Sequence, residues 1–574
     1  MLINGSPING ALINGATGSV AAPEPVYVVA GISYRWRLRL LVGGVDMSDQ
    51  VLGETDTDRE GGAAGVGGLE LYLPPGPVVP SDWVGRSVTL DFIWTSQGVT
   101  HEERRYTGQI LAPSWDAANR ILACELSDNL QQRAEALSVA EIDALTGGFW
   151  SPDVFEPVEG RSRWDYALER MSTRTASLDC SPTGELRVSS WYAMATPHYV
   201  FGPGTTLDGS VSLQLPDLSR LTNRVVIEAD YRYSRLRQRN EYYTWRQPTA
   251  GGHEDIQGFC AWHASGSQEA ATIEMVEDAV AANGQLLVPE YYRVPATSTG
   301  GFNSGWYCDP QFAWRNDFDN LLLGADFGVG RRWVQRITER YSLTVEAPTS
   351  IALAGPVLGR AGGAFEVESA QAEAWVNDPF SDGLTGHTDE RDEPRRQAFF
   401  AVLLRQALAQ LVDAHRATRI TLSLPTPMAA GIDLTHTLQL GDQGIAAQGR
   451  VTRVRDLFDN NNGTAITTLE LAVMRGGGTV SDPLVPPPSV DEPQPEQDWT
   501  ATILPTQMGR VFDAPPYDDE LPGYSGNFEH GSGPEYPRRF DVPVSEIPAE
   551  QRDELPVPIE ATYRVAIPND LLEL

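Results

Sequence analysis

Short segments in which apolar and polar residues strictly alternate are the strongest constraint in this sequence. In YRWRLRL the arginines are interleaved with large apolar residues, Tyr34, Trp36, Leu38 and Leu40, and SVTLDFIW repeats the pattern. A period of two places every second side chain on one face of a strand. GLELYL, RYTGQIL and RILACEL are further short segments of this kind, separated by turn residues. Many strands at short spacing predict a closed barrel or a sandwich in residues 27–128.

The pattern changes at Asp128, where helix-like segments begin. Asp128 is a candidate cap for DNLQQRAEALS, because an aspartate side chain accepts hydrogen bonds from the free N–H groups that open a helix. RSRWDYALERMST predicts a second helix with apolar residues on one side, namely Trp164, Ala167, Leu168 and Met171. SPTGELRVSSW then has the residues of a turn and a strand. Residues 129–222 are therefore expected to form a small α/β unit.

Residues 223–348 return to a β pattern. NRVVIEADYRY places one row of residues on a common face, Val225, Ile227, Ala229, Tyr231 and Tyr233. RLRQRNEYYTW is either the partner strand of a long hairpin or an extension of the same strand. QEAATIEMVEDAVAANG predicts a helix that ends at Asn283-Gly284, and RRWVQRITERYSLTVEAP predicts a helix that passes into a strand. We expect a second β-barrel region here, with an insertion near 250–330.

EPRRQAFFAVLLRQALAQLVDAHR predicts the longest helix of the chain. Asp392 is a plausible cap, and Pro394 falls in the first turn, where a missing N–H does no harm. Its apolar residues cover one broad face, so we expect that face to be buried: Phe399, Phe400, Val402, Leu403, Leu404, Leu408 and Leu411. The segments that follow predict strands, and RVTRVRDL and TAITTLELAV form a hairpin around a polar turn at 459–463.

The composition shifts again after Gly476. Residues 477–574 begin with a Pro-rich acidic stretch and hold 19 Asp and Glu against 5 Arg. Aromatic residues nevertheless recur along this region, whereas disordered segments are usually poor in them. We therefore expect an extended segment that becomes ordered against other surfaces.

Together these segments predict a mainly β, multidomain chain with α+β parts. The expected division is an extended N-terminal assembly arm (1–26), a first hub β-barrel (27–128), a small α/β domain (129–222), a second β-barrel region with an insertion (223–348), a closing domain of helix and β-hairpin (349–476) and a Pro-rich acidic C-terminal extension (477–574).

The charge of the chain limits its partners. A formal net charge of −34 over 574 residues disfavours a protein that grips nucleic acid or docks on an anionic membrane, since both need a basic surface. An acidic surface instead lets DNA pass without binding. The sequence contains no lysine, which excludes Schiff-base chemistry and a P-loop. We also expect no membrane insertion, because about 18 uninterrupted apolar residues occur nowhere.

The first residues repeat the tripeptide Ile-Asn-Gly three times at a spacing of five. Asn-Gly pairs favour turns, so the repeat predicts short extended steps rather than a helix or a secretory signal. Two alternatives stay open, a disordered tail and an arm that pairs with another subunit. In the second case the assembly contacts are Ile3, Asn4, Ile8, Asn9, Ile13 and Asn14.

Candidate catalytic and metal-binding residues are few. Glu228 and Asp230 share one strand face, as a glycosidase pair would, but charges on the solvent side of a sheet explain them better. His253, Cys260 and His263 match no familiar zinc spacing. The other candidate residues also have structural explanations. Isolated histidines are the simpler interpretation of His198, His387, His415 and His436, and a hairpin turn explains DLFDNNNGTA. Reduced core thiols explain Cys124, Cys180, Cys260 and Cys308. We therefore expect no enzyme, no cofactor and no metal.

The order of three stretches resembles the central hub proteins of bacteriophage tail tips and baseplates, a family shared with contractile injection machines. The first is LRLLVGGVDMSDQV, followed by LELYLP, SVTLDFIW and RRYTGQIL. The second is LACELSDNLQQRAEAL with RWDYALERMSTRTASLDCSPTGELRV, and the third runs from ATRITLSLP to TTLELAV. The resemblance covers about residues 27–476. The Ile-Asn-Gly repeat and the acidic C-terminal region depart from the family.

The resemblance implies a structural virion protein. Hub proteins form homotrimers, in which two barrels per chain make a pseudo-sixfold ring between the tail tube and the tip. Tube, tape-measure and tip or fibre proteins would be its partners, and DNA would pass through the ring without specific binding. Two alternatives stay open: another tail-tip or receptor-binding, carbohydrate-binding protein, and a β-rich glycoside-active enzyme.

Overall fold

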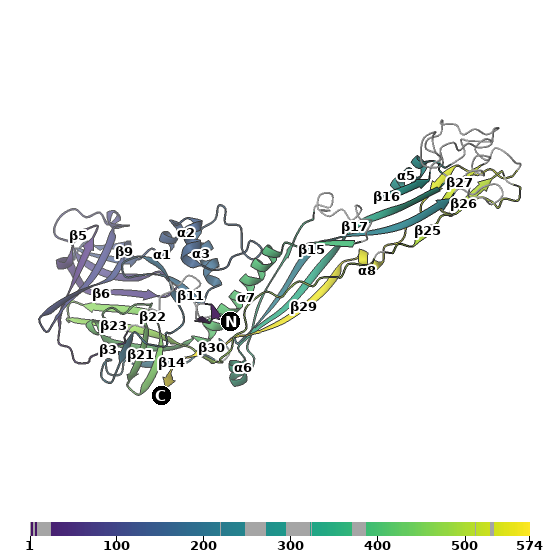
Figure 1. The fold of residues 1–574 in the computed structure, drawn as a ribbon. Helices are drawn as coiled ribbons and strands as arrows, with labels where there is room; N and C mark the ends of the chain where they lie inside the picture. Colours follow the sequence, from purple (N-terminus) through teal and green to yellow (C-terminus); the bar gives the residue numbers. More distant parts are fainter. Residues whose placement is uncertain are drawn as a thin grey trace.

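The computed structural model describes residues 2–3, 6–7, 24–217, 220–246, 271–293, 322, 324–369, 386–496, 498–510, 512–527 and 533–574. It shows a mainly β chain with several sheets, which confirms the predicted class. Figure 1 shows a broad body that holds the largest sheet and a long arm that projects from it. The long helix α7 (Glu393–His415) lies where the two meet.

The body is built on a 15-stranded sheet. The main path across it runs β14-β20-β23-β22-β6-β7-β10-β9-β8-β4-β5, and β13, β21, β3 and β31 pair beside this path. The strands are β3 (Val26–Val28), β4 (Arg35–Val42), β5 (Val45–Asp46), β6 (Val51–Glu60), β7 (Val66–Tyr72), β8 (Ser87–Ser96), β9 (Val99–Asp116), β10 (Ile121–Ser127), β13 (Tyr199–Phe201), β14 (Ser212–Gln214), β20 (Thr418–Pro425), β21 (Thr437–Asp442), β22 (Ile445–Asp459), β23 (Thr464–Val473) and β31 (Leu572–Glu573).

Two β units distant in sequence join within this sheet. Strand β22 pairs antiparallel with β6, from Arg453 opposite Glu60 to Asp459 opposite Glu54. Each unit has its own apolar core, one among β4 to β10 and one among β20 to β23 with β13. The alternation seen in the sequence explains the first core, because Leu38, Leu40 and Phe92 all point into it.

A small α/β unit follows the first β unit. Its elements are α1 (Leu130–Glu135), α2 (Val139–Thr146), α3 (Arg163–Ser172) and the hairpin of β11 (Ala176–Cys180) and β12 (Leu186–Ser190). Asp128 lies one residue before the N-cap Asn129, yet its carboxylate accepts a hydrogen bond from Leu130 N at 3.0 Å. It also accepts one from Gly65 N at 2.8 Å, so Asp128 ties the helix start to the body.

The arm is a hairpin of two 23-residue strands, β15 (Arg224–Arg246) and β17 (Gly324–Glu346), paired along their full length. Short segments cover both outer edges in succession. On β15 these are β18 (Leu358–Glu366), β19 (Gly386–Glu390) and β25 (Ala501–Ile503). On β17 they are β29 (Leu555–Arg564) and β16 (Leu286–Arg293). Because free strand edges invite pairing with other chains, this covering protects the hairpin.

The base of the arm packs on α7. Asp392 caps this helix as predicted, accepting a hydrogen bond from Arg395 N at 3.1 Å. The predicted apolar face is buried, with Phe400 and Leu404 fully enclosed and Leu408 partly enclosed. It meets the row Val225 to Tyr233 of β15, so both sequence patterns belong to one core.

A second, smaller core lies at the tip. It joins α5 (Ile273–Ala282), the ends of β15 and β17, and residues of the C-terminal region, including Tyr524 and Phe540. Beside it β26 (Thr506–Gly509), β27 (Gly523–Asn527) and β28 (Arg539–Asp541) form a small sheet. The helix α5 ends before Asn283-Gly284, as the sequence predicted, and Gly284 has a φ of 64°.

The C-terminal region runs along the arm to its tip and back to the body (Figure 1). On the way out lie residues 479–496, which we call the strap, and then β25. On the way back come α8 (Ala549–Arg552), β29, β30 (Ile567–Asn569), which pairs with β24 (Arg475–Gly477), and β31 in the body sheet. The remaining described elements are β1 (Leu2–Ile3), β2 (Ser6–Pro7), α6 (Pro348–Ala354) and the 3-10 turns η1 (Ser48–Gln50), η2 (Pro80–Trp83) and η5 (Thr426–Ala429).

The arm differs from the prediction in two respects. RRWVQRITERYSLTVEAP was expected to pass from helix into strand, but its residues up to Glu346 are all part of β17, because β15 supplies a partner throughout. Residues 223–348 were expected to contain a second barrel, and their long strands instead form the arm hairpin. The second β unit of the body comes from residues 418–473, and a closed barrel is not seen in the part of the chain that is described.

Candidate functional site: a polar joint in the arm

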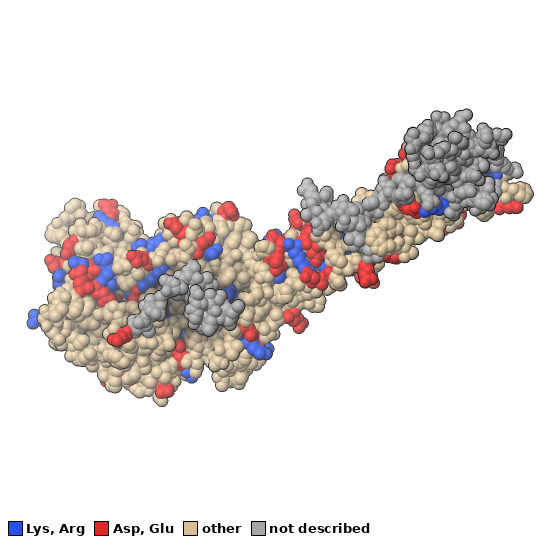
Figure 2. Space-filling model, viewed as in Figure 1, with Lys and Arg blue, Asp and Glu red and all other residues tan. Residues whose placement is uncertain are grey.

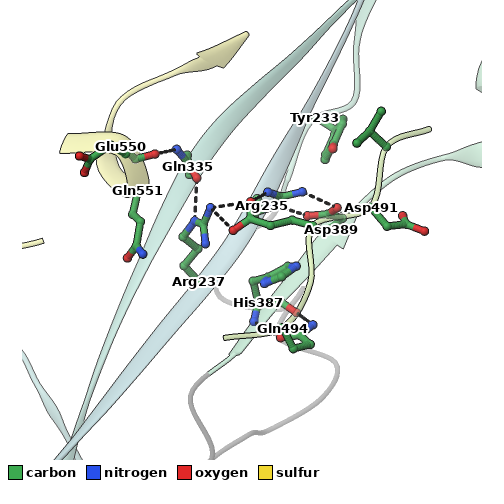
Figure 3. Close-up of polar contacts among 12 residues, drawn as sticks. Tyr233, Arg235, Arg237, Gln335, His387, Asp389, Asp491, Gln494, Glu550 and Gln551 are labelled. Carbon is green, nitrogen blue, oxygen red and sulfur yellow. Dashed lines mark hydrogen bonds and ion pairs between the residues drawn. The ribbon is translucent and has the colours of Figure 1, made fainter. Parts of the chain in front are cut away.

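Between its two apolar cores the arm contains a buried polar cluster, which we call the polar joint. It consists of Arg235, Arg237, Gln335, Asp389, Arg391 and Glu492. Arg235, Arg237 and Gln335 are buried, although strand interiors usually hold apolar residues. Figure 3 shows the side chains converging from β15, β17, β19 and the strap.

Arg235 is the centre of the polar joint. Its Nε and Nη2 donate to the two oxygens of Asp389 at 2.5 and 2.9 Å, a bidentate pairing. Its Nη1 donates to Glu492 of the strap. A single guanidinium therefore links β15, β19 and the strap.

Arg237 connects the strap to the returning C-terminal segment. Its Nη2 donates to Glu492 at 3.0 Å, and its Nε donates to Gln335 Oε1 at 2.6 Å. Gln335 Nε2 in turn donates to the carbonyl oxygens of Glu550 and Asp553, at 2.7 and 2.9 Å. Both passes of the C-terminal region are thus held by one network (Figure 3).

Arg391 fixes the strap beside helix α7. It donates to Tyr233 Oη at 2.9 Å, to Asp491 Oδ1 at 2.5 Å and to the carbonyl oxygen of Val490 at 2.6 Å. It also pairs with Asp389 at 2.8 Å. On the space-filling surface, basic and acidic residues gather side by side in this middle part of the arm (Figure 2).

The electrostatics of the polar joint follow from burial and close pairing. Burial lowers the pKa of Arg235, but the hydrogen bonds and charge of Asp389 outweigh it, so the net shift is upward. Burial and the nearby Arg235 lower the pKa of His387, which keeps its ring neutral. Burial raises the pKa of Tyr233. The network is therefore suited to holding segments together in fixed charge states.

Of the six predicted N-terminal contact residues, Ile3 is among the described residues. Ile3 belongs to β1, which pairs with β2 through Ile3 opposite Ser6. Asn4, Ile8, Asn9, Ile13 and Asn14 lie outside the described residues. These six residues stay a prediction.

Glu228 and Asp230 lie on the open face of the arm base, away from α7. They border a shallow hollow of about 440 Å³ with Arg340, which is opposite Asp230 on β17. Glu228 is exposed, as expected for the solvent side of a sheet.

The other candidates lie apart from one another. His387 borders the polar joint, and His415 is buried with Nδ1 2.7 Å from Leu411 O. His198 and His436 meet edge to face in the body, with ring centroids 4.8 Å apart. Cys124 and Cys180 are buried free thiols, and burial raises the pKa of each. His253, Cys260, His263 and Cys308 lie outside the described residues. Within the described ranges no three His, Cys, Asp or Glu side chains are grouped to hold a metal.

Sequence reasoning missed the polar joint. Its signal was present in RLRQRN, where charged and amide residues occupy both faces of a strand. Such a strand is either fully solvated or buried against polar partners. The partners of Arg235 come from β19 and from the acidic strap, 154 and 257 residues further along, and pairing over such distances cannot be read from one sequence.

The chain is thus a mainly β protein with a body, an arm and a C-terminal region that interlocks them. No family model and no curated protein matches it. Among solved structures, it is similar to the tail protein from Neisseria meningitidis MC58, with 11% identity, 76% of this chain and 96% of that chain covered, and a TM-score of 0.35. It is also similar to the 43 kDa tail protein of prophage MuSo2 from Shewanella oneidensis, with 9% identity, 76% and 98% covered, and a TM-score of 0.34.

A third similar structure is prophage tail protein gp18 from Listeria monocytogenes EGD-e, with 7% identity, 76% and 94% covered, and a TM-score of 0.31. The structural neighbours are therefore phage tail proteins, together with the Francisella PdpA-VgrG complex. Over the ranges that the structure describes, none of the helices has the length and apolarity needed to span a membrane.

Proposed function

We propose that this chain is the hub of a bacteriophage tail tip or baseplate and acts as a structural virion protein. Three copies form a ring that connects the tail tube to the tip and surrounds the channel for DNA. Tube, tape-measure and tip or fibre proteins are its partners.

One observation carries the proposal: the body contains two β units per chain, each with its own core, joined through β6 and β22. The three sequence stretches that resemble hub proteins supply these units and the α/β unit between them. Two units per chain and three chains give six units around an axis. That count matches a sixfold tube to a threefold tip.

The charge of the chain supports the proposed channel for DNA. With a net charge of −34, the surface repels phosphates, so a genome passes through the ring without adhering to it. The Ile-Asn-Gly repeat is the proposed assembly contact with a neighbouring subunit or tail protein.

The experiment is to determine the copy number and shape of the assembled protein. We expect native mass measurement of purified tail tips to give three copies, and averaged electron-microscope images to show six β units around an opening. A single copy per tip, or a ring without a central opening, would contradict the hub.

A further inference from the structure

A second buried cluster of charges lies in the body, where the α/β unit meets the large sheet. Arg59 comes from β6, Asp179 and Arg187 from the β11–β12 hairpin, and Arg450 from β22. Asp433 comes from the loop before β21. We call these five residues the arginine junction, and Asp433, Asp179, Arg59 and Arg450 are all buried.

The carboxylates of the arginine junction are shared by two of its arginines. Asp433 accepts from Arg59 Nη1 at 2.6 Å and from Arg187 Nη1 at 2.5 Å. Asp179 accepts from Arg187 Nε at 2.7 Å. These three bonds join β6, β12 and the loop before β21.

Arg450 is the third arginine, and it has no such partner. It is only 7% exposed, and within the described residues its guanidinium makes no hydrogen bond or ion pair. Burial lowers its pKa to about 10, while the charges of Asp179 and Asp433 oppose that shift. Arg59 and Arg187 therefore make all the arginine hydrogen bonds to the two aspartates within the described residues, and the buried Nε of Arg450 is left without a hydrogen-bond partner.

Two neighbouring histidines do not supply that counterion. His436 Nδ1 accepts from Asp433 N at 2.9 Å, and His198 Nδ1 accepts from Thr437 N at 3.0 Å. Because Nδ1 accepts, the proton of each neutral ring is on Nε2. Burial lowers the pKa of His436 to about 4, so both rings add donors and no negative charge.

The unpaired atoms of the arginine junction are mostly donors. Arg59 Nε and Nη2, Arg187 Nη2 and Arg450 Nε are buried without a partner. On the other side are one acceptor, Asp179 Oδ2, and the hydroxyl of Ser189, which interacts with the Asp179 carboxylate and so leaves the arginine donors without a partner. Buried polar groups are normally satisfied, and a concentration of unsatisfied ones indicates a bound ion or water. An excess of N–H donors and of positive charge selects an anion.

We propose that the arginine junction binds a small inorganic anion of the chloride class next to Arg450. The anion neutralises the third arginine and fixes the α/β unit to the body sheet. A ligand that binds only the folded state stabilises it in proportion to its occupancy, so the protein's stability should depend on chloride.

The experiment measures the melting temperature of the full-length protein as chloride replaces gluconate at constant ionic strength. We expect the melting temperature to rise with chloride in the wild type and to stay constant in Arg450→Met. In gluconate alone Arg450→Met should be at least as stable as the wild type, because it removes an unpaired buried charge. Arg455→Met is the matched control, since Arg455 is exposed on the same strand, and it should respond to chloride like the wild type.

Line broadening of the ³⁵Cl resonance provides a second readout that does not depend on unfolding. We expect broadening by the wild type, displacement by bromide, and loss of the broadening in Arg450→Met or in the milder Arg450→Gln. An equal chloride response in all variants would mean a general salt effect, and no response in the wild type would mean that water fills the junction. Either result would overturn the proposal.

Discussion

At the scale of single residues, the arm depends on a few charge pairs that connect distant parts of the chain. Glu492 contacts both Arg235 and Arg237, which have only 3% and 7% of their side chains exposed. The carboxylate itself is 34% exposed, so solvent weakens these pairs. Glu492 acts together with the bonds that Arg391 makes to Asp491 and to the carbonyl oxygen of Val490.

Replacing Glu492 by Gln should loosen the strap. The change removes one negative charge from between two buried guanidinium groups, and we expect a cost of about 1–3 kcal/mol in strap docking. Hydrogen exchange of the amides in residues 484–496 should speed up accordingly.

Glu496→Gln is the control for this variant, because Glu496 is exposed on the same strap. If both variants exchange at the same rate as the wild type, Glu492 does not anchor the strap.

At the scale of elements, α7 is the support of the arm base. Leu404 is fully buried against the β15 and β17 strands, and its removal leaves a cavity. We expect Leu404→Ala to destabilise the arm base by about 2–5 kcal/mol, measured as faster hydrogen exchange in β15 and β17.

Leu408→Ala should cost less, since Leu408 is only partly buried one turn further along the same helix. A larger effect at Leu408 than at Leu404 would contradict this packing.

The helix and the first strands were predictable because their signals are local. Asp392, Pro394 and the broad apolar face of α7 lie within 20 residues, and the alternation around Trp36 lies within a single strand. The pairing of β22 with β6, by contrast, joins residues nearly 400 positions apart, so no local pattern contains it.

The segment RRWVQRITERYS shows how tertiary pairing overrides local propensity. Its composition is compatible with a helix, but β15 and β29 provide partners on both sides of its C-terminal half. The polar joint was missed for the same reason, since the burial of Arg235 depends on Asp389 and Glu492 from other segments.

At the scale of the whole molecule, the C-terminal region completes the arm. It contributes β25, α8 and β29 along the hairpin edges and apolar residues to both arm cores. Pro556 and Pro558 on β29 cannot donate hydrogen bonds, which discourages further pairing on that outer edge.

Removing residues 479–574 should therefore leave the body folded and the arm exposed. We expect the truncated protein to self-associate through the uncovered edges of β15 and β17, seen as larger species in sedimentation velocity.

Deleting only residues 571–574 is the control, because it removes β31 and nothing from the arm. A truncated protein that lacks 479–574 and sediments like the wild type would show that the hairpin does not need this cover.

The double passage of the C-terminal region also has a mechanical consequence. Strands β15, β17 and β29 all run lengthwise between body and tip, and their hydrogen bonds lie across that direction. A pull on the tip therefore acts along the strand backbones and does not open these hydrogen bonds one at a time. The arm is therefore suited to transmitting tension from its tip to the body.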